Sequence, residues 1–308
     1  MKPVTIGTRG SKLALWQAHW IEQQLKDRDI PTRIEIIKTT GDKITDVALA
    51  KVGSQTGLKG VFTKEIEDAL IAGSIDLAVH SLKDLPTELD SCLVVKVIPQ
   101  RADPRDALAG MPLVELPKGA KVGTSSLRRG AQMRRLRPDV QVEDIRGNVD
   151  TRLRKLAEGR YDAILLASAG LQRLGCQDRI AEILEPEVML PAVGQGALGI
   201  ETRVGDDTIN ELLSPLDDPQ TRIAVTAERA LLSALGGGCQ MPLGAYATLD
   251  GERLSLLAVV VSEDGGRAVR VAVAGESSAP KALGQAAAAE LLDQGAKDLM
   301  KFQSPERK

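Results

Sequence analysis

The chain has 308 residues, of which 43% are hydrophobic and 27% are charged, and its net charge at pH 7 is only −2. This length and composition indicate a globular protein of two or three domains, and no apolar run is long enough to span a membrane. The first residues lack the apolar stretch of a signal peptide, so we expect a cytoplasmic protein without a membrane partner.

The three cysteines and two histidines are widely scattered, at positions 92, 176 and 239 and at positions 19 and 80. Such spacing gives neither a disulfide framework nor a zinc site, so we expect reduced thiols and no bound metal. We interpret Cys92 and Cys176 as ordinary packing residues.

Along the first 190 residues, short apolar runs alternate with helical patterns. The predicted strands are residues 4–7, 34–37, 76–79, 93–98, 121–123 and 163–166, and the clearest helical patterns are 13–20, 64–72 and 149–158. This alternation predicts α/β layers with a mainly parallel sheet.

Proline and glycine mark two points where the chain leaves one unit for another, near residues 98–100 and 190–196. Two crossings predict two α/β lobes that face a cleft. From about Leu216 the pattern changes to a helix, a glycine loop, a meander over 254–274 and an amphipathic helix over 281–302, which indicates a smaller α+β unit. The expected domains are 1–98 with 194–215, then 99–193, then 216–308.

Polar residues follow two of the predicted strands, where open α/β sheets bind their ligands. Asp84 comes soon after the strand at 76–79, although an aspartate beside Pro86 also fits an ordinary turn. Residues 124–129 run from a strand into hydroxyl groups and two arginines. This pattern suits an anion at a helix start, although a serine cap before a basic surface helix has the same pattern.

Positive charge is concentrated between Lys121 and Arg160, where eleven cationic and five anionic side chains give a net charge of +6. Nearly all of these cations are arginines, whose guanidinium groups suit two-point recognition of carboxylate or phosphate. Aromatic residues make up only 2% of the chain, so no stacking platform supports nucleic-acid binding. The pattern therefore predicts an anionic partner other than nucleic acid.

Cys239 follows three glycines, at the end of a helix that we predict over residues 220–235 and that Gly236 stops. A small buried cysteine is the ordinary alternative. Neighbouring glycines weaken a core but leave space around a thiol, so we favour a cysteine that carries a covalently attached group.

Six segments, in order and covering nearly the whole chain, resemble the porphobilinogen deaminase family, also called hydroxymethylbilane synthase. They are residues 13–18, 80–86, 122–129, 145–153, 190–196 and 237–244. The resemblance implies a monomer of three domains: two lobes similar to type II periplasmic binding proteins around a cleft, and a small α+β domain.

The resemblance also implies a transferase that joins four molecules of its substrate porphobilinogen head to tail, with release of ammonia, into the linear tetrapyrrole hydroxymethylbilane. In the family, the cysteine that matches Cys239 holds a dipyrromethane cofactor through a thioether, and the aspartate that matches Asp84 works at the pyrrole nitrogens. Loss of ammonia leaves an electron-poor azafulvene, so a carboxylate there stabilises the developing positive charge and assists proton transfer.

Each pyrrole carries acetate and propionate groups, which would explain the arginine excess. By the resemblance, the cofactor-binding residues are Cys239, Ser81, Lys83, Thr124, Ser125, Ser126, Arg128, Arg129, Arg146 and Gly147. The substrate-binding residues are Arg9, Ser11, Lys59, Phe62, Arg152, Arg173 and Gln195. Residues 51–62 depart from the family pattern by roughly four extra residues, which fit a cleft lid or a tolerated surface insertion.

Two other functions compete with this one. A non-catalytic two-lobed binder of a small carboxylate needs the arginines but has no use for a thiol among glycines. A cysteine hydrolase needs a histidine base, and His19 lies in a predicted helix while His80 lies near the proposed pyrrole site. A covalent adduct on the purified chain distinguishes the enzyme from the binder.

Overall fold

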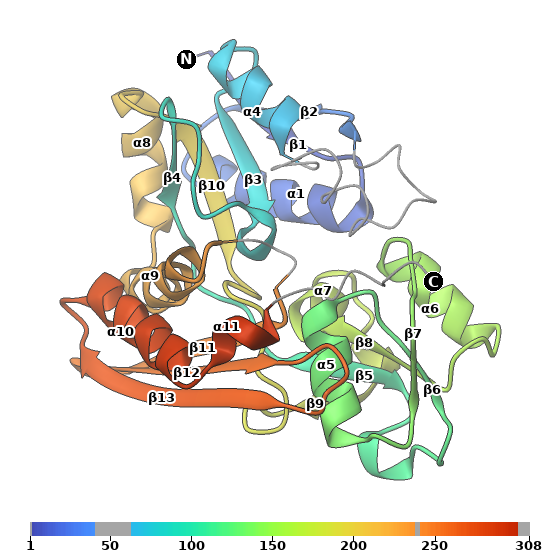
Figure 1. The fold of residues 1–308 in the computed structure, drawn as a ribbon. Coiled ribbons are helices and arrows are strands. Elements are labelled where there is room, and N and C mark those ends of the chain that lie inside the picture. The colour runs from blue at the N-terminus through green and yellow to red at the C-terminus, as the bar shows by residue number, and fades with distance from the viewer. Residues whose placement is uncertain (1, 41–62, 238–240, 301–308) are drawn as a thin grey trace.

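The computed structural model describes residues 2–40, 63–237 and 241–300, which form three units (Figure 1). The first lobe contains a five-stranded sheet in the order β2-β1-β3-β10-β4. Its elements are β1 (Val4–Thr8), α1 (Lys12–Lys26), β2 (Thr32–Ile36), α4 (Lys64–Ile71), β3 (Leu77–Ser81), β4 (Leu93–Val97), β10 (Leu198–Arg203) and α8 (Asp207–Leu213).

The second lobe contains another five-stranded sheet, in the order β7-β6-β8-β5-β9. Its elements are β5 (Asp106–Gly110), β6 (Lys121–Gly123), α5 (Leu127–Leu136), β7 (Gln141–Glu143), α6 (Val149–Ala157), β8 (Ala163–Ala167), α7 (Ser168–Arg173) and β9 (Ile180–Leu184). The two sheets have equivalent strand orders, with β10 and β5 in the same place. The predicted class, two α/β lobes with a small additional α+β unit, is confirmed.

The prediction of a mainly parallel sheet is confirmed for four of the five strands in each lobe, which point the same way, but not for the fifth. Strand β10 is antiparallel to both β3 and β4, and β5 is antiparallel to both β8 and β9. Each of these strands is the first that the chain forms after it crosses from one lobe to the other. It therefore enters its sheet from the opposite end, while β1 with β2 and β3, and β6 with β7 and β8, remain parallel.

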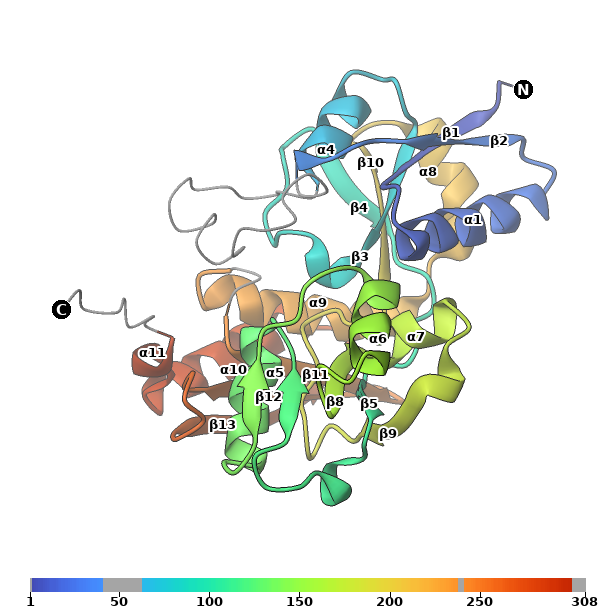
Figure 2. The same cartoon turned by 90° about the vertical axis from the view of Figure 1, so that its right-hand side faces the viewer.

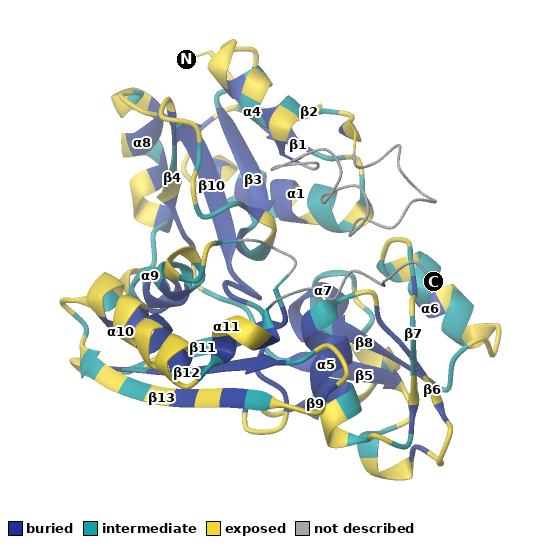
Figure 3. Ribbon diagram, in the orientation of Figure 1, coloured by how far each residue is buried: buried dark blue, intermediate teal, exposed yellow. Residues whose placement is uncertain are grey.

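The third unit is an antiparallel sheet, β11 (Leu243–Asp250), β12 (Arg253–Val261) and β13 (Ala268–Glu276), packed against helices α9 (Pro219–Ala234) and α10 (Pro280–Asp293). Its core joins buried residues of both helices to one face of the sheet. Strand β13 alternates between buried and exposed positions, which Figure 3 shows as bands. The predicted helix over 281–302 is interrupted at Gly295 (φ 88°), after which the short α11 (Ala296–Leu299) follows.

Helix α9 lies between the three-stranded sheet and the first lobe in both views of the ribbon (Figures 1 and 2). Asp218 caps its start by accepting a hydrogen bond from the N–H of Thr221 at 2.7 Å, and Pro219 occupies the first turn. Gly236 ends it with a left-handed φ of 95°, as predicted, and the N–H of Gly237 bonds the carbonyl of Leu232 at 2.9 Å. The third unit also contacts the second lobe, where Arg134 donates to the Glu263 carbonyl at 2.9 Å.

Among the described residues, no helix is both long and apolar enough to cross a membrane. The interpretation of Cys92 as a packing residue is wrong, because it is exposed in a turn where Asp90 accepts its backbone N–H. Cys176 is half-buried at the edge of a core cluster of the second lobe.

Candidate functional site

The candidate site is built from segments that come after the parallel strands of the two lobes. In the first lobe, Arg9 and Ser11 follow β1, and Lys83 and Asp84 follow β3. In the second lobe, residues 124–129 follow β6, Arg146 follows β7, and Arg173 ends the helix that follows β8. The carboxyl ends of such strands are where open α/β sheets bind ligands, so the topology gathers most of the predicted residues on facing edges of the lobes.

Two arginines from the first turn of α5 and a glutamine from the second crossing surround one carboxylate. Nη1 of Arg128 lies 2.5 Å and Nε of Arg129 lies 2.8 Å from the carboxylate oxygens of Asp106. Nε2 of Gln195 donates to the same carboxylate at 2.9 Å. Burial would raise the pKa of Asp106, but the two guanidinium groups outweigh it and hold that pKa far below its ordinary value.

This cluster carries an excess of positive charge. All four side chains are buried, and Arg128 also donates to the Leu190 carbonyl at 2.7 Å. Two guanidinium groups thus share one carboxylate. Nε of Arg128 is buried and finds no hydrogen-bond acceptor among the described residues.

The amide oxygen of Gln195 connects the cluster to the first lobe. It accepts from Nη2 of Arg129 at 3.3 Å and from Nζ of Lys83 at 3.4 Å. Burial, followed by the positive charge of Arg129, lowers the pKa of Lys83 to about 8. The ammonium group of Lys83 therefore adds to the positive potential of the arginine cluster. Lys83 belongs to the first lobe and directly precedes Asp84.

Arg101 and Glu228 fix the two crossings between the lobes. Glu228 of α9 is fully buried and binds Arg101 through both carboxylate oxygens, at 2.7 and 3.1 Å. It also accepts the backbone N–H groups of Gly194 and Ala247, at 2.7 and 2.9 Å. Nε of Arg101 donates to the carbonyl of Gln195 at 2.8 Å. The third unit therefore holds the backbone of Gln195 in place.

The predicted hydroxyl residues of the second lobe mostly organise the backbone. Ser126 caps α5, since its side chain accepts the N–H of Arg129 at 3.4 Å. The hydroxyl of exposed Ser125 donates to the Ile145 carbonyl at 2.7 Å, and buried Thr124 accepts the N–H of Ser126 at 3.2 Å. These bonds fix the loop after β6 against the loop after β7.

Arg146, Gly147 and Arg152 form a second group of predicted residues on this lobe. Gly147 adopts a φ of 109°, and a side chain there would collide with Thr151 at 2.6 Å, so the turn requires glycine. Nε of Arg152 donates to the Gly147 carbonyl at 2.8 Å. Burial, followed by the positive charges of Arg129 and Arg146, lowers the pKa of Arg152 to about 10.

The remaining predicted residues of the first lobe and of α7 lie around α1. Ser11 caps this helix by accepting the N–H of Ala14 at 3.3 Å, and half-buried Arg9 lies two residues before it. The hydroxyl of Ser81 accepts from Nε2 of Gln17 at 2.8 Å. These contacts lie within the first lobe, and no described hydrogen bond joins Ser11 or Ser81 to the Asp106 cluster.

Arg173 of the second lobe reaches across to the first. It donates to the Gly196 carbonyl at 2.7 Å, and its guanidinium carbon lies 5.7 Å from the ring centre of Trp16 on α1. Burial lowers its pKa to about 10. Trp16 remains more than a third exposed, so Arg173 and Trp16 together form a contact between the lobes near the candidate site.

Asp84 is exposed, and the segment that carries it is fixed to α9. Arg229 donates to the carbonyls of Leu85 and Pro86, at 3.2 and 2.6 Å. At the end of the same helix, a side chain at Gly237 would meet the hydroxyl of Thr87 at 2.6 Å. The base of the glycine loop therefore lies against the Asp84 segment. Cys239, Lys59 and Phe62 lie outside the described residues.

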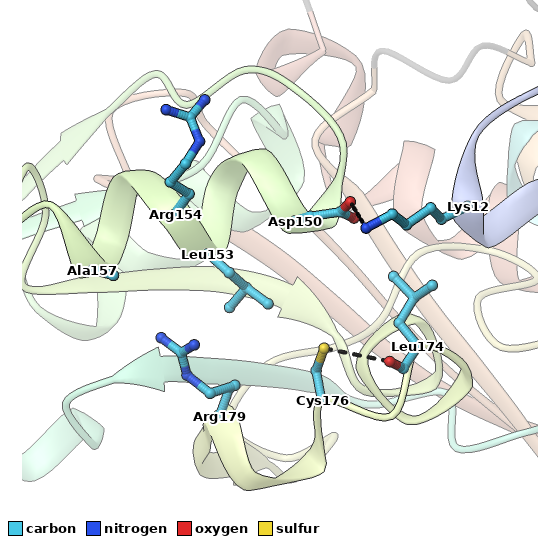
Figure 4. A pocket seen from close by; sticks show the side chains of 8 residues that line it. All are labelled: Lys12, Asp150, Leu153, Arg154, Ala157, Leu174, Cys176 and Arg179. Carbon is cyan, nitrogen blue, oxygen red and sulfur yellow. Dashed lines mark hydrogen bonds and ion pairs between the residues drawn. The ribbon is translucent and has the colours of Figure 1, made fainter.

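A cavity of about 340 Å³ lies between α1, α6 and the turn after α7 (Figure 4). At one end, Nζ of Lys12 and a carboxylate oxygen of Asp150 lie 2.8 Å apart and join the two lobes. Sγ of Cys176 donates to the Leu174 carbonyl in the same cavity, at 3.5 Å. None of the predicted site residues lines this cavity, so it neighbours the candidate site and does not form it.

Sequence reasoning missed Asp106, Arg101, Glu228 and Arg229, although each fixes a predicted residue or segment. A motif search had no signal for Asp106, because its partners are 22, 23 and 89 positions away in the chain. The histidines do not form a hydrolase site among the described residues. His80 is buried and bonds Glu201 at 3.0 Å, and exposed His19 bonds Glu22.

Comparisons with known proteins identify the family. The family model described as porphobilinogen deaminase, dipyromethane cofactor binding domain, matches residues 4–211, and the model of the C-terminal domain of the same family matches residues 222–293. A porphobilinogen deaminase of Roseiflexus castenholzii is 54% identical over 302 residues, covering 96% of this chain and 98% of that relative.

A porphobilinogen deaminase of Syntrophobacter fumaroxidans is 49% identical over 302 residues, covering 96% of each chain. Among solved structures, a periplasmic substrate-binding protein of an ABC transporter from Coxiella burnetii is 14% identical, with a TM-score of 0.43, covering 71% of this chain and 93% of that chain. So remote a likeness adds nothing to the assignment. The family models and the close relatives cover nearly the whole sequence, and the chain belongs to the porphobilinogen deaminase family.

Proposed function

We propose that this chain is a transferase that condenses four porphobilinogen molecules head to tail into hydroxymethylbilane and releases ammonia at each step. It works on a dipyrromethane primer attached through a thioether to Cys239. Two features together carry the proposal. One is the exposed carboxylate of Asp84 in the first lobe, and the other is the buried cluster of the second lobe, in which two guanidinium groups share one carboxylate.

The donor set fits dipyrromethane. That group carries an acetate and a propionate on each of two pyrrole rings, hence four carboxylates. The Asp106 cluster has one more guanidinium than carboxylate, and Lys83 adds an ammonium whose pKa of about 8 reflects burial and a positive neighbour. A carboxylate at this position relieves that repulsion and gains charge-assisted hydrogen bonds. Lys83, Arg129 and the hydroxyls of Ser125 and Ser126 would hold it.

Cys239 is well suited to anchor the primer. The glycine loop that leads to it begins at Gly236 and Gly237, and Gly237 contacts Thr87, three residues after Asp84. A group attached to Cys239 therefore starts close to the segment that carries the carboxylate. When bound, dipyrromethane supplies the carbon nucleophile to which substrate units are added.

Asp84 holds the pyrrole N–H of the incoming substrate. As ammonia leaves, positive charge develops on the ring, and an ionised carboxylate within hydrogen-bond distance of the ring nitrogen lowers the energy of that state. The same carboxylate accepts and returns the proton that is exchanged during ring coupling. Arg229 supports this function indirectly, since it fixes the carbonyls of Leu85 and Pro86 and thereby the turn.

The second lobe binds the acidic side chains of substrate and product. Arg146 and Arg152 extend the positive surface beyond the primer, and Arg9, Ser11, Arg173 and Gln195 continue it toward the first lobe. We assign domain 1 to 1–98 and 194–215, domain 2 to 99–193 and domain 3 to 216–308. The chain acts as a cytoplasmic monomer. Lys59 and Phe62 contribute to substrate binding from the lengthened segment 51–62.

Intact-mass measurement tests the proposal. The purified protein should exceed its sequence mass by one dipyrromethane, and quenching shortly after addition of porphobilinogen should give up to four further masses, each spaced by porphobilinogen minus ammonia. Cys239→Ala should abolish the adduct and the activity, while Cys92→Ala and Cys176→Ala retain both. A chain that stays at its sequence mass would instead be a binder of small carboxylates.

A further inference from the structure

A second cavity, of about 400 Å³, lies between α9, the first turn of α10 and the first lobe. Its apolar wall includes Leu82, Val95 and Val225, all buried or half-buried. None of the residues assigned to cofactor or substrate lines it. The cavity has the volume of a small-molecule site. Seven of its twelve lining residues are polar or charged, so it suits a ligand with both an apolar and a polar part.

The charged residues that line this cavity are all cationic. They are Arg222, Arg229 and Lys281, and no lining residue carries a carboxylate. Asp217 offsets the charge of Arg222, because Nε of Arg222 donates to it at 2.7 Å. Lys281 is exposed at the start of α10, where the N-cap residue Ala279 forms no side-chain hydrogen bond. The positive end of that helix therefore adds to the charge of Lys281.

We propose that this cavity binds a small organic anion with an apolar body, an aryl or alkyl carboxylate. The apolar body packs against Leu82, Val95 and Val225, and the carboxylate lies toward Lys281 and the uncapped start of α10. The hydroxyls of Thr87 and Thr226 line the same cavity and supply neutral donors. Cation, helix end and apolar wall together select an amphipathic anion over inorganic phosphate or a neutral ligand.

The occupant changes turnover, because the cavity shares a wall with the segment that carries Asp84. Leu82 is the first residue of the short helix Leu82–Asp84, and Thr87 lies just beyond that helix. Arg229 lines the cavity and also bonds the carbonyls of Leu85 and Pro86. A ligand that contacts both sides alters the position of Asp84. This consequence for turnover rests on the proposed role of Asp84, whereas the binding site does not.

Calorimetric titration of the holoenzyme with 2-naphthoate tests the site, with neutral 2-naphthalenemethanol as the matched uncharged probe. We expect one molecule of 2-naphthoate per chain with a Kd below about 1 mM, and binding of the alcohol at least about tenfold weaker. Lys281→Glu, which reverses the charge, and Thr226→Phe, which fills the cavity, should each weaken 2-naphthoate by at least about tenfold. Lys297→Glu, the same charge change on α11, should leave the Kd unchanged.

Circular dichroism and thermal unfolding establish that each variant is folded. Equal 2-naphthoate binding by wild type, Lys281→Glu and Thr226→Phe would place the probe elsewhere, in the arginine-rich cleft for example, and would overturn the proposal. Equal binding of acid and alcohol would overturn the assignment of an anion. Saturating 2-naphthoate should change the turnover of wild type but not of Lys281→Glu. An unchanged wild-type rate would overturn the proposed effect of the ligand on turnover. The calorimetry measures binding alone, so its result does not depend on whether the proposed reaction is correct.

Discussion

The two lobes have equivalent strand orders but carry different side chains just beyond the ends of their strands. In the first lobe, β3 leads to an exposed carboxylate, Asp84, beside a single half-buried ammonium, Lys83. In the second lobe, β6 leads to two buried guanidinium groups that are held by Asp106. Asp84 is open to solvent, whereas the buried ion cluster is enclosed by protein. The comparison therefore supports the proposal that the first lobe carries the chemistry and the second lobe the electrostatic binding.

The largest effect is expected from Asp84→Asn, which keeps the size of the side chain and removes its charge. Turnover should fall by at least about a hundredfold with KM little changed, because a positioned acid–base or electrostatic group is lost. Steady-state kinetics measure this, and Glu88→Gln, an exposed carboxylate four residues away, is the matched control. Equal loss in both variants would show that the charge of the segment matters and not the position of Asp84.

Asp106→Asn in the second lobe should lower the stability of the fold more than it affects the chemical step. It leaves two buried guanidinium groups without their carboxylate, and breaking a buried ion pair on one side costs about 3–5 kcal/mol of unfolding free energy. Urea unfolding measures the loss. Asp139→Asn is the control, since it removes one partner of a half-buried ion pair with Arg137 in the same lobe, and its loss of stability should be smaller. Comparable losses in the two variants would contradict the buried-cluster interpretation.

Arg152→Gln should weaken substrate binding while leaving the chemical step nearly intact. The loss of a charge-assisted hydrogen bond is worth about 1.5–3 kcal/mol, so KM for porphobilinogen should rise about tenfold or more. Arg154→Gln, on the same helix but exposed and paired with Glu158, should leave KM unchanged. A fall in kcat with unchanged KM would move Arg152 from the binding surface to the reacting centre.

The sequence predicted those elements whose pattern is local. Strands β1, β3, β6 and β8 are short apolar runs, and helices α4 and α6 follow a clear helical period. Strand β5 was missed because its residues Asp106–Gly110 lack β-branched side chains, and β10 was missed because Glu201 and Thr202 are polar yet buried. Their burial depends on neighbours that come from distant parts of the chain.

The candidate site follows the same division. Asp84 and residues 124–129 could be found because ligand sites lie at strand ends, a rule that needs only the order of elements. The charge count alone does not separate Arg128 from Arg134, but α5 buries Arg128 against Asp106 and directs Arg134 to the third unit. Which arginines bind internally and which face a ligand depends on helix orientation, which composition does not contain.

The smallest effect is expected from the ion pair that joins the lobes, Lys12 with Asp150. Its side chains are 75% and 45% exposed, so water and salt screen the attraction and the pair contributes little to folding. It joins the two lobes, and we expect a lengthening product to require their separation. In Lys12→Ala, the later additions of porphobilinogen should speed up relative to the first by about twofold, as exposed pairs allow. Rapid-quench mass spectrometry measures the ratio of the later rates to the first.

Added salt should have the same effect on the wild type as Lys12→Ala, and the charge swap Lys12→Asp with Asp150→Lys should restore the wild-type ratio. If the swap behaves like Lys12→Ala, the lobes are not held by this pair.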